Sequence, residues 1–192
     1  MIMKEDPLYQ QLDYDKAYRE NRLQAAHWVL AHLETMPRLL EYCFRDDSRL
    51  SYKALWVLEF VCREDLSALY PHLDYFLEHL HKAKLDQAVR PVAMICELLT
   101  LAYYKKKDPN LQPLFNQQHK EAMTECCFDW MITEQKVACQ ARAMTSLYLL
   151  GTEFEWIHPE LKPIIETHIH TGSAGYKARG KSILQQIDSF KG

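Results

Sequence analysis

A basic side chain recurs at one position of a short helical phrase, and a row of such charges is suited to binding an acidic peptide or phosphate groups. The phrase occurs four times, at residues 51–56, 88–93, 138–143 and 175–180. Its aligned positions hold Lys53, Arg90, Gln140 and Lys177. With flanking residues, the copies supply the candidates for a binding face, which are Lys53, Trp56, Arg90, Arg142, Lys177 and Arg179.

These charges lie beside apolar residues, and two interpretations are open. On a helix, Lys53 neighbours Trp56 and Phe60, three and seven positions further along. A charge next to a core is tolerated when it is paired, so the row can be a structural ladder of ion pairs. Acids available for this ladder include Glu59, Asp86 and Glu97. Alternatively, the same side chains line a concave face, where Trp56, Arg90 and Arg142 would anchor a partner.

The histidines and cysteines lack the spacing of a metal or redox site. Residues two apart on a helix point about 200° away from each other, so His79 with His81 cannot chelate from one face. The six cysteines show no CxxC spacing and are predicted to be reduced thiols in the core. Adjacent Cys126 and Cys127 would form a strained bond. We expect no metal and no cofactor, and we assign no catalytic residue.

Composition predicts one all-α domain over residues 1–192, with a polar leader at 1–14. The chain is 48% apolar, contains only five glycines and lacks period-two runs of β-branched residues. Its formal net charge of −3 disfavours a dedicated nucleic-acid binder, which usually carries a basic excess. Neither a signal peptide nor a run of about 18 apolar residues is present, so we expect a cytoplasmic protein that is not in a membrane.

Helical segments recur along the chain in pairs. A first helix is expected at residues 15–32, and Pro37, Pro71 and Pro159 each precede an amphipathic run, as proline at the first turn of a helix does. The second helices are expected at residues 51–62, 86–104, 135–150 and 173–187. The polar stretch at 105–110 is predicted to be a projecting loop. Gly151 is expected to end a helix, with Thr152 and Glu155 forming a capping box.

The spacing of the copies predicts a repeat architecture. Between the aligned residues the intervals are 37, 50 and 37 residues, which fits one helical hairpin per repeat with a single insertion. A lone hairpin cannot bury its apolar face, so the hairpins must stack. We therefore expect a right-handed α-α superhelix of about five hairpins, closed by a capping repeat at about residues 159–192.

The segment around Asp86 has the pattern Asp-x-x-Val-Arg-x-x-Ala, ending at Ala93, and resembles the second helix of HEAT repeats. The other copies keep the apolar skeleton but replace the acid with Arg49, Lys136 and Ser173. The resemblance implies a HEAT/armadillo-like solenoid that acts as a non-catalytic scaffold and binds a protein or another macromolecule on its concave face. HEAT-like folds also include alkylpurine DNA glycosylases, and the alternative function is a nucleic-acid-binding or DNA-repair protein.

A second resemblance is carried by residues 54–62, 127–131 and 151–162. These segments are similar to small helical Bacteroidetes proteins that are often catalogued as adenylosuccinate lyase, which implies an enzyme related to purine metabolism. Lyases of that superfamily carry a glycine- and serine-rich loop ending in Met-Pro-x-Lys-x-Asn-Pro, and this sequence has no such segment. The scaffold is therefore the preferred interpretation, with the lyase as a further alternative.

Overall fold

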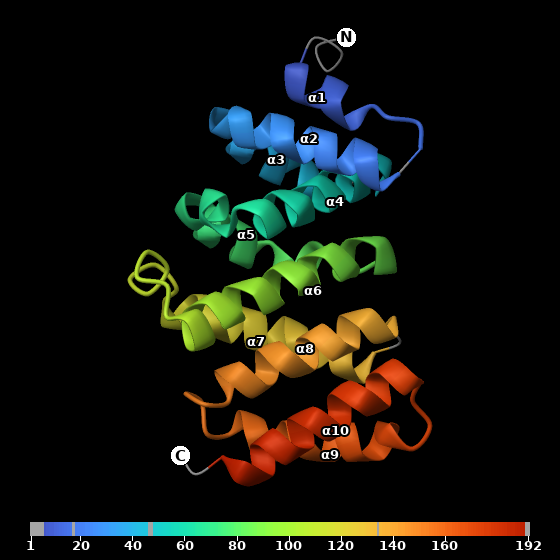
Figure 1. Ribbon diagram of the computed structural model, residues 1–192, viewed down its shortest axis with the longest axis vertical. Coiled ribbons are helices and arrows are strands. Elements are labelled where there is room, and N and C mark those ends of the chain that lie inside the picture. Colours follow the sequence, from blue (N-terminus) through green and yellow to red (C-terminus); the bar gives the residue numbers. More distant parts are fainter. Residues whose placement is uncertain (1–5, 17, 46–47, 134, 191–192) are drawn as a thin grey trace. The chain divides into compact units, whose positions relative to one another are not determined.

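The computed structural model describes residues 6–16, 18–45, 48–133 and 135–190, and these residues contain ten α-helices and no strand (Figure 1). The all-α fold class is confirmed. The helices fall into two compact units, Met1–Ile95 and Cys96–Gly192, which divide within α6.

The first unit is built around α4, Ser48–Glu64, which packs against α1, Pro7–Leu12, α2, Arg19–Ala31, and α3, Met36–Cys43. Leu8 and Leu12, both 1% exposed, lie within the expected polar leader and are buried from α1. Asp6 caps this helix, because its carboxylate accepts a hydrogen bond from the backbone N–H of Leu8. The leader is thus partly a packed helix, and its two leucines four positions apart form one apolar face.

Two short 3₁₀ turns and α5 lead to the last helix of this unit. The turn Leu66–His72 contains Pro71, and α5, Leu73–Glu78, follows directly, as expected. A second turn, Leu80–Lys82, precedes α6, Asp86–Thr100.

The second unit is organised around α8, Val137–Leu150, which packs against α7, Gln117–Ile132, α9, Ile157–Ile169, and α10, Ala174–Ser189 (Figure 1). Residues Ala143 to Leu150 of α8 are all buried, as in a central helix. Gly180 on α10 permits close packing on α9, because a Cβ there would lie 2.9 Å from Cγ2 of Ile165. The four predicted second helices are confirmed within a few residues at either end.

The segment expected as a projecting loop, residues 105–110, begins with the last two residues of a π-helix, Leu101–Lys106, which continues α6. The π-helix is followed by Lys107, whose backbone is left-handed with φ 52°. The π-helix is held by Lys120, whose Nζ donates hydrogen bonds to the hydroxyl of Tyr103 at 3.0 Å and to both carboxylate oxygens of Glu153 at 2.8 and 2.9 Å. Tyr104 donates to the same carboxylate at 2.7 Å.

Gly151 follows α8 as predicted, but the capping box does not form. The hydroxyl of Thr152 donates back to the carbonyl of Leu149, and α9 begins later, at Ile157. Gly151 instead leaves room for the side chain of His158, because a Cβ at this position would lie 2.2 Å from Cδ2 of His158. The imidazole of His158 packs there and donates through Nε2 to the carbonyl of Tyr148 at 2.8 Å.

Candidate binding cavity

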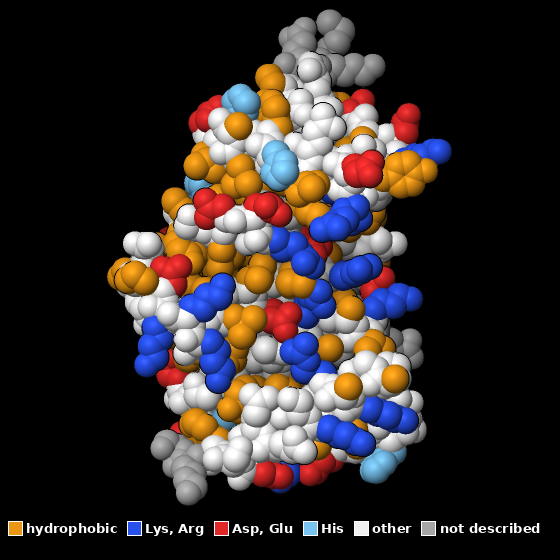
Figure 2. All heavy atoms as spheres, in the orientation of Figure 1, with side chains coloured by type: hydrophobic (Ala, Val, Ile, Leu, Met, Phe, Trp, Pro, Cys, Tyr) orange, Lys and Arg blue, Asp and Glu red, His pale blue; other side chains and the backbone are white. Residues whose placement is uncertain are grey.

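A cavity of about 480 Å³ in the first unit is lined by side chains of α2, α4 and the first turns of α6. Its lining residues are Arg19, Arg22, Trp56, Glu59, Phe60, Arg63, Glu64, Asp86, Gln87 and Arg90. Figure 2 shows Lys and Arg side chains gathered over α4 and α6 on the face that it displays. Two of the predicted binding residues, Trp56 and Arg90, therefore lie in the same cavity.

Proline in α6 positions Trp56. Pro91 has no N–H, so the carbonyl of Gln87, four residues earlier, lacks its usual helical donor. The indole Nε1 of Trp56 donates to this carbonyl at 3.2 Å. The hydrogen bond joins α4 to α6 and fixes the indole as one wall of the cavity.

Arg22 from α2 lies over both aromatic side chains of α4. Its guanidinium carbon is 5.7 Å from the ring centroid of Trp56 and 5.3 Å from that of Phe60. Such contacts stabilise a cation by roughly 0.5–2 kcal/mol, depending on how far it is desolvated. The Nε of Arg22 is buried and has no hydrogen-bond partner in the described part of the chain.

One arginine of the cavity is neutralised within it, and three are not. Arg63 donates two hydrogen bonds to Glu59 Oε1, at 2.9 and 2.7 Å, one helical turn away. Arg19, Arg22 and Arg90 make no ion pair with any residue that the structure describes. Each guanidinium offers five N–H donors and no acceptor, so the three create an excess of donors.

Two acidic side chains moderate this charge. Asp86 lies in the first turn of α6, where the helix dipole favours a carboxylate, and its Oδ1 is buried with no hydrogen-bond partner among the described residues. Glu64 is exposed at the end of α4. The unpaired side chains of the lining thus comprise three guanidiniums and two carboxylates, which suits an anion that arrives with several acceptor oxygens.

Lys53 lies outside this cavity. Its side chain is 8% exposed, and the ammonium donates a hydrogen bond to the carbonyl of Tyr14 and lies 4.6 Å from that ring centroid. Burial, with Arg49 nearby, lowers the pKa of Lys53 despite the opposing carboxylates of Asp13 and Asp15. Lys53 therefore fastens the segment before α2 onto α4, and its part in a binding face stays a prediction.

The second unit holds the remaining candidates. Arg142 and Arg179 converge on Glu97, with N–O distances of 3.8 and 3.2 Å. Arg179 also donates to the hydroxyl of Thr145. This arrangement matches the structural ladder of ion pairs, which is one of the two interpretations that the sequence allows. Lys177, half-buried on α10, makes no ion pair with the residues described.

Sequence reasoning missed Arg19, Arg22 and Arg63, because none belongs to the repeated phrase. Arg19 and Arg22 are three positions apart on α2, so they share a helical face. That spacing was readable, but the pairing of α2 with α4 that brings them to Trp56 was not. Glu59, one of the acids expected to pair with the repeated basic position, forms its ion pair with Arg63.

No group of three or more His, Cys, Asp or Glu side chains in the described ranges could hold a metal ion. Over the same ranges, every helix is too short or too polar to cross a membrane.

Comparison with known proteins bears on the architecture. The model of a HEAT repeat domain matches residues 10–187, a range that includes most of both units. No curated protein and no solved structure matches the chain. The match covers the tandem helices and the motif of α6 that resembles HEAT repeats, and it shows that the chain belongs to the HEAT repeat domain family.

Proposed function

We propose that the protein is a non-catalytic interaction scaffold, and that the arginine-lined cavity of its first unit receives acidic side chains of a protein partner. The observation that carries this proposal is the presence of Arg19, Arg22 and Arg90, without ion-pair partners in the described part of the chain, around one cavity of about 480 Å³. The aromatic wall of Trp56 and Phe60 lies beside them. Buried aromatic and arginine side chains are the residues that most often dominate binding energy.

A protein partner is favoured over a nucleic acid. Asp86, Glu59 and Glu64 also line the cavity, and they would repel a continuous phosphate backbone. The formal net charge of the chain is −3, so the basic character is local. Acidic side chains at separate positions of a peptide can reach the arginines and avoid these carboxylates. Stacked helical repeats commonly provide extended binding surfaces of this kind.

The proposal is tested with fluorescein-labelled hexaglutamate and the full chain, by fluorescence anisotropy. We expect saturable binding that weakens steeply between 50 and 500 mM salt, because the contacts are charged and partly exposed. Arg90→Glu should reduce the affinity at least tenfold and leave the far-UV circular dichroism unchanged, because Arg90 is exposed and pairs with no described residue.

Lys181→Glu is the matched control, because it makes the same change in net charge at an exposed position of α10. Equal losses in the two variants would show that only overall charge matters and would contradict the proposal. Tighter binding to a DNA duplex than to hexaglutamate would favour the nucleic-acid alternative, and turnover of adenylosuccinate by the purified protein would favour the lyase.

A further inference from the structure

The arginine-lined cavity of the first unit also carries negative charge. Arg63 and Glu59 neutralise each other, and the other charged side chains of the lining are three guanidiniums and two carboxylates. A purely anionic ligand would satisfy the guanidiniums and leave the carboxylates of Glu64 and Asp86 without a cation. Because binding partners present complementary charge, a ligand that matches the whole lining must bring a positive group together with its negative ones.

Asp86 and Arg90 place the two signs of charge one helical turn apart. They are four positions apart on α6, a spacing that puts their Cβ atoms about 5–6 Å apart and lets acidic and basic side chains pair. Neither forms an ion pair with the other or with any further residue that the structure describes, and both line the cavity. Asp86 is half-buried, and its Oδ1 lacks a hydrogen-bond partner among those residues. Such a carboxylate is best satisfied by a donor that carries positive charge.

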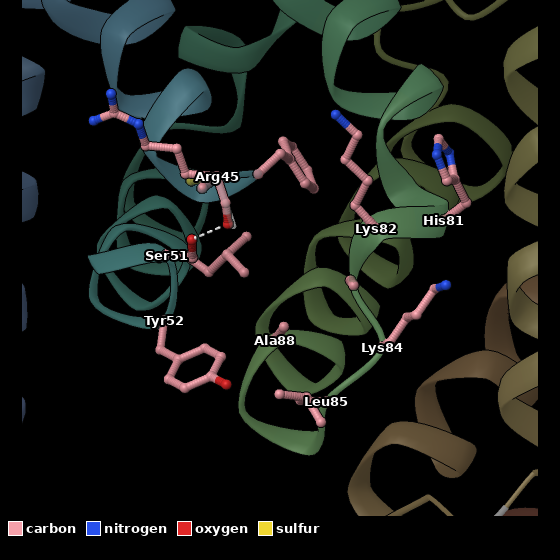
Figure 3. A pocket seen from close by; sticks show the side chains of 12 residues that line it. Arg45, Ser51, Tyr52, His81, Lys82, Lys84, Leu85 and Ala88 are labelled. Carbon is pink, nitrogen blue, oxygen red and sulfur yellow. Dashed lines mark hydrogen bonds between the residues drawn. The ribbon is translucent and has the colours of Figure 1, made fainter. Parts of the chain in front are cut away.

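A second cavity of the first unit lacks this mixture of charges. It measures about 570 Å³, and Figure 3 shows Ser51 and Tyr52 of α4 facing Ala88 of α6 and Leu85, which precedes α6, while the side chain of Lys84 points away from them. No described lining residue of this second cavity is acidic, so it offers no partner for a ligand cation. Charged side chains of both signs therefore distinguish the arginine-lined cavity.

We propose that the arginine-lined cavity binds the free N-terminus of a protein partner whose first residues are acidic. The α-ammonium group would bind to the carboxylate of Asp86, and the side-chain carboxylates of the first residues would bind to Arg90 and to Arg22. An N-terminal aspartate or glutamate carries its ammonium and its carboxylate within one residue, so the two groups can bridge one helical turn. The inference rests on the proposed function and names the part of the partner that the cavity recognises.

The test compares the peptide Glu-Glu-Glu-Gly-Cys, with a free α-amino group, to its N-acetylated counterpart. Both carry fluorescein on the cysteine, and their binding to the full chain is followed by fluorescence anisotropy. We expect the free peptide to bind about tenfold more tightly, because only its ammonium donates charged hydrogen bonds to Asp86. Acetylation makes the peptide more negative, so attraction to a basic patch alone predicts the opposite order. The sign of the difference is therefore decisive.

Asp86→Asn should remove the preference for the free peptide, because the amide keeps the size of the side chain and loses its charge. The acetylated peptide should bind to this variant at least as tightly as to the wild type, since a repelling carboxylate is gone. Glu160→Gln is the matched control, because it removes one carboxylate from the first turn of another helix, α9, at an exposed position. This control should retain the preference.

A change of pH tests the same contact on the unaltered protein, so the inference does not depend on the folding of a variant. The α-amino group of a peptide has a pKa of about 7.7–8.0 and loses its charge between pH 6.5 and pH 9.5. The described titratable side chains of the lining are Arg, Asp and Glu, whose ordinary pKa values lie outside this range. The advantage of the free peptide should therefore disappear at pH 9.5, while the acetylated peptide should bind equally at both pH values.

The outcomes separate this inference from the proposed function. Equal affinities, or tighter binding of the acetylated peptide, with both peptides weakened by Arg90→Glu, would overturn the inference and leave the proposed function standing. Absence of binding by either peptide would overturn both. An acetylated peptide with lysine at its second position that binds as tightly as the free peptide would assign Asp86 to a lysine side chain and overturn the N-terminal assignment. Displacement of the peptide by equimolar free glutamate would assign the cavity to an amino acid and also overturn it.

Discussion

Removal of Glu153 should destabilise the second unit more than removal of its partner Lys120. The ammonium of Lys120 is buried, with a side chain 5% exposed, whereas the side chain of Glu153 is 42% exposed. Glu153→Ala leaves a buried cation with the hydroxyl of Tyr103 and three aromatic rings, those of Tyr103, Tyr104 and Phe115, whose centroids lie 4.2, 5.9 and 6.0 Å from its Nζ. Lys120→Met leaves a carboxylate that water can solvate and that Tyr104 still contacts.

The expected magnitudes follow from this difference in burial. Breaking a buried ion pair by removing one partner costs about 3–5 kcal/mol, and the exposure of Glu153 reduces this to about 2–3 kcal/mol for Glu153→Ala. For Lys120→Met we expect about 1 kcal/mol, because an apolar side chain of similar length replaces the buried charge. The double variant should be more stable than Glu153→Ala alone, since it leaves no unpaired buried cation.

The pH dependence has a definite sign. Burial opposes ionisation of Glu153, but hydrogen bonds from Lys120 and Tyr104 outweigh it and lower its pKa. Burial likewise opposes the charge of Lys120, and the bonds to Glu153 and Tyr103 raise its pKa. Stability from Glu153 is therefore present above its ordinary value of 4.5 and lost as the pH falls through the lowered pKa. Stability from Lys120 is present below 10.5 and lost as the pH rises through its raised pKa.

The assay is urea denaturation followed by circular dichroism at pH 4 and pH 7, with hydrogen exchange of residues 101–116 as a local readout. In Glu153→Ala the amides of this segment should exchange faster, since Lys120 no longer ties α7 to the π-helix through that carboxylate. The reasoning is refuted if Lys120→Met is the more destabilising change, or if the difference between wild type and Glu153→Ala grows as the pH falls.

Two further predictions concern glycine and cysteine. Gly151→Ala should lower the free energy of unfolding by about 2–4 kcal/mol, because the new methyl group displaces His158 and breaks its hydrogen bond to the carbonyl of Tyr148. Urea denaturation measures this change, and an unchanged midpoint of unfolding would contradict the close contact. The six thiols are buried. Burial raises the pKa of Cys126 to about 12. It also raises the pKa values of the other cysteines with a resolved shift, which are Cys43, Cys62, Cys96 and Cys127. We expect Ellman's reagent to titrate them only in denaturant, and rapid reaction of the native protein would refute this.

The fold was predictable because its signals are local. The repeated phrase located the second helices of four pairs within a few residues. The HEAT-like motif ending at Ala93 indicated the family that the match over residues 10–187 confirms. The failure at Thr152 is equally local, since its hydroxyl bonds backward to Leu149 and no helix starts there. Hydrogen bonds of single side chains are set by packing, which helical periodicity does not describe.

The cavity was only partly predictable, because it depends on contacts between distant segments. Trp56 and Arg90 were readable from the repeats, but Arg22 reaches them through the packing of α2 on α4. The hydrogen bond from the indole of Trp56 to the carbonyl that Pro91 leaves without a helical donor could not be predicted, although the missing N–H of proline is evident from the sequence. That Lys53, Arg142, Lys177 and Arg179 share one binding wall with them stays a prediction.

The most direct test of the central claim is an NMR titration of the ¹⁵N-labelled protein with hexaglutamate, observing the indole N–H of tryptophan and the Nε–H of arginine. We predict that the signals of Trp56, Arg22 and Arg90 shift together and saturate at one affinity. Shifts confined to Arg142 and Arg179 of the Glu97 cluster, or no shift at Trp56, would contradict the assignment of the cavity as the binding site.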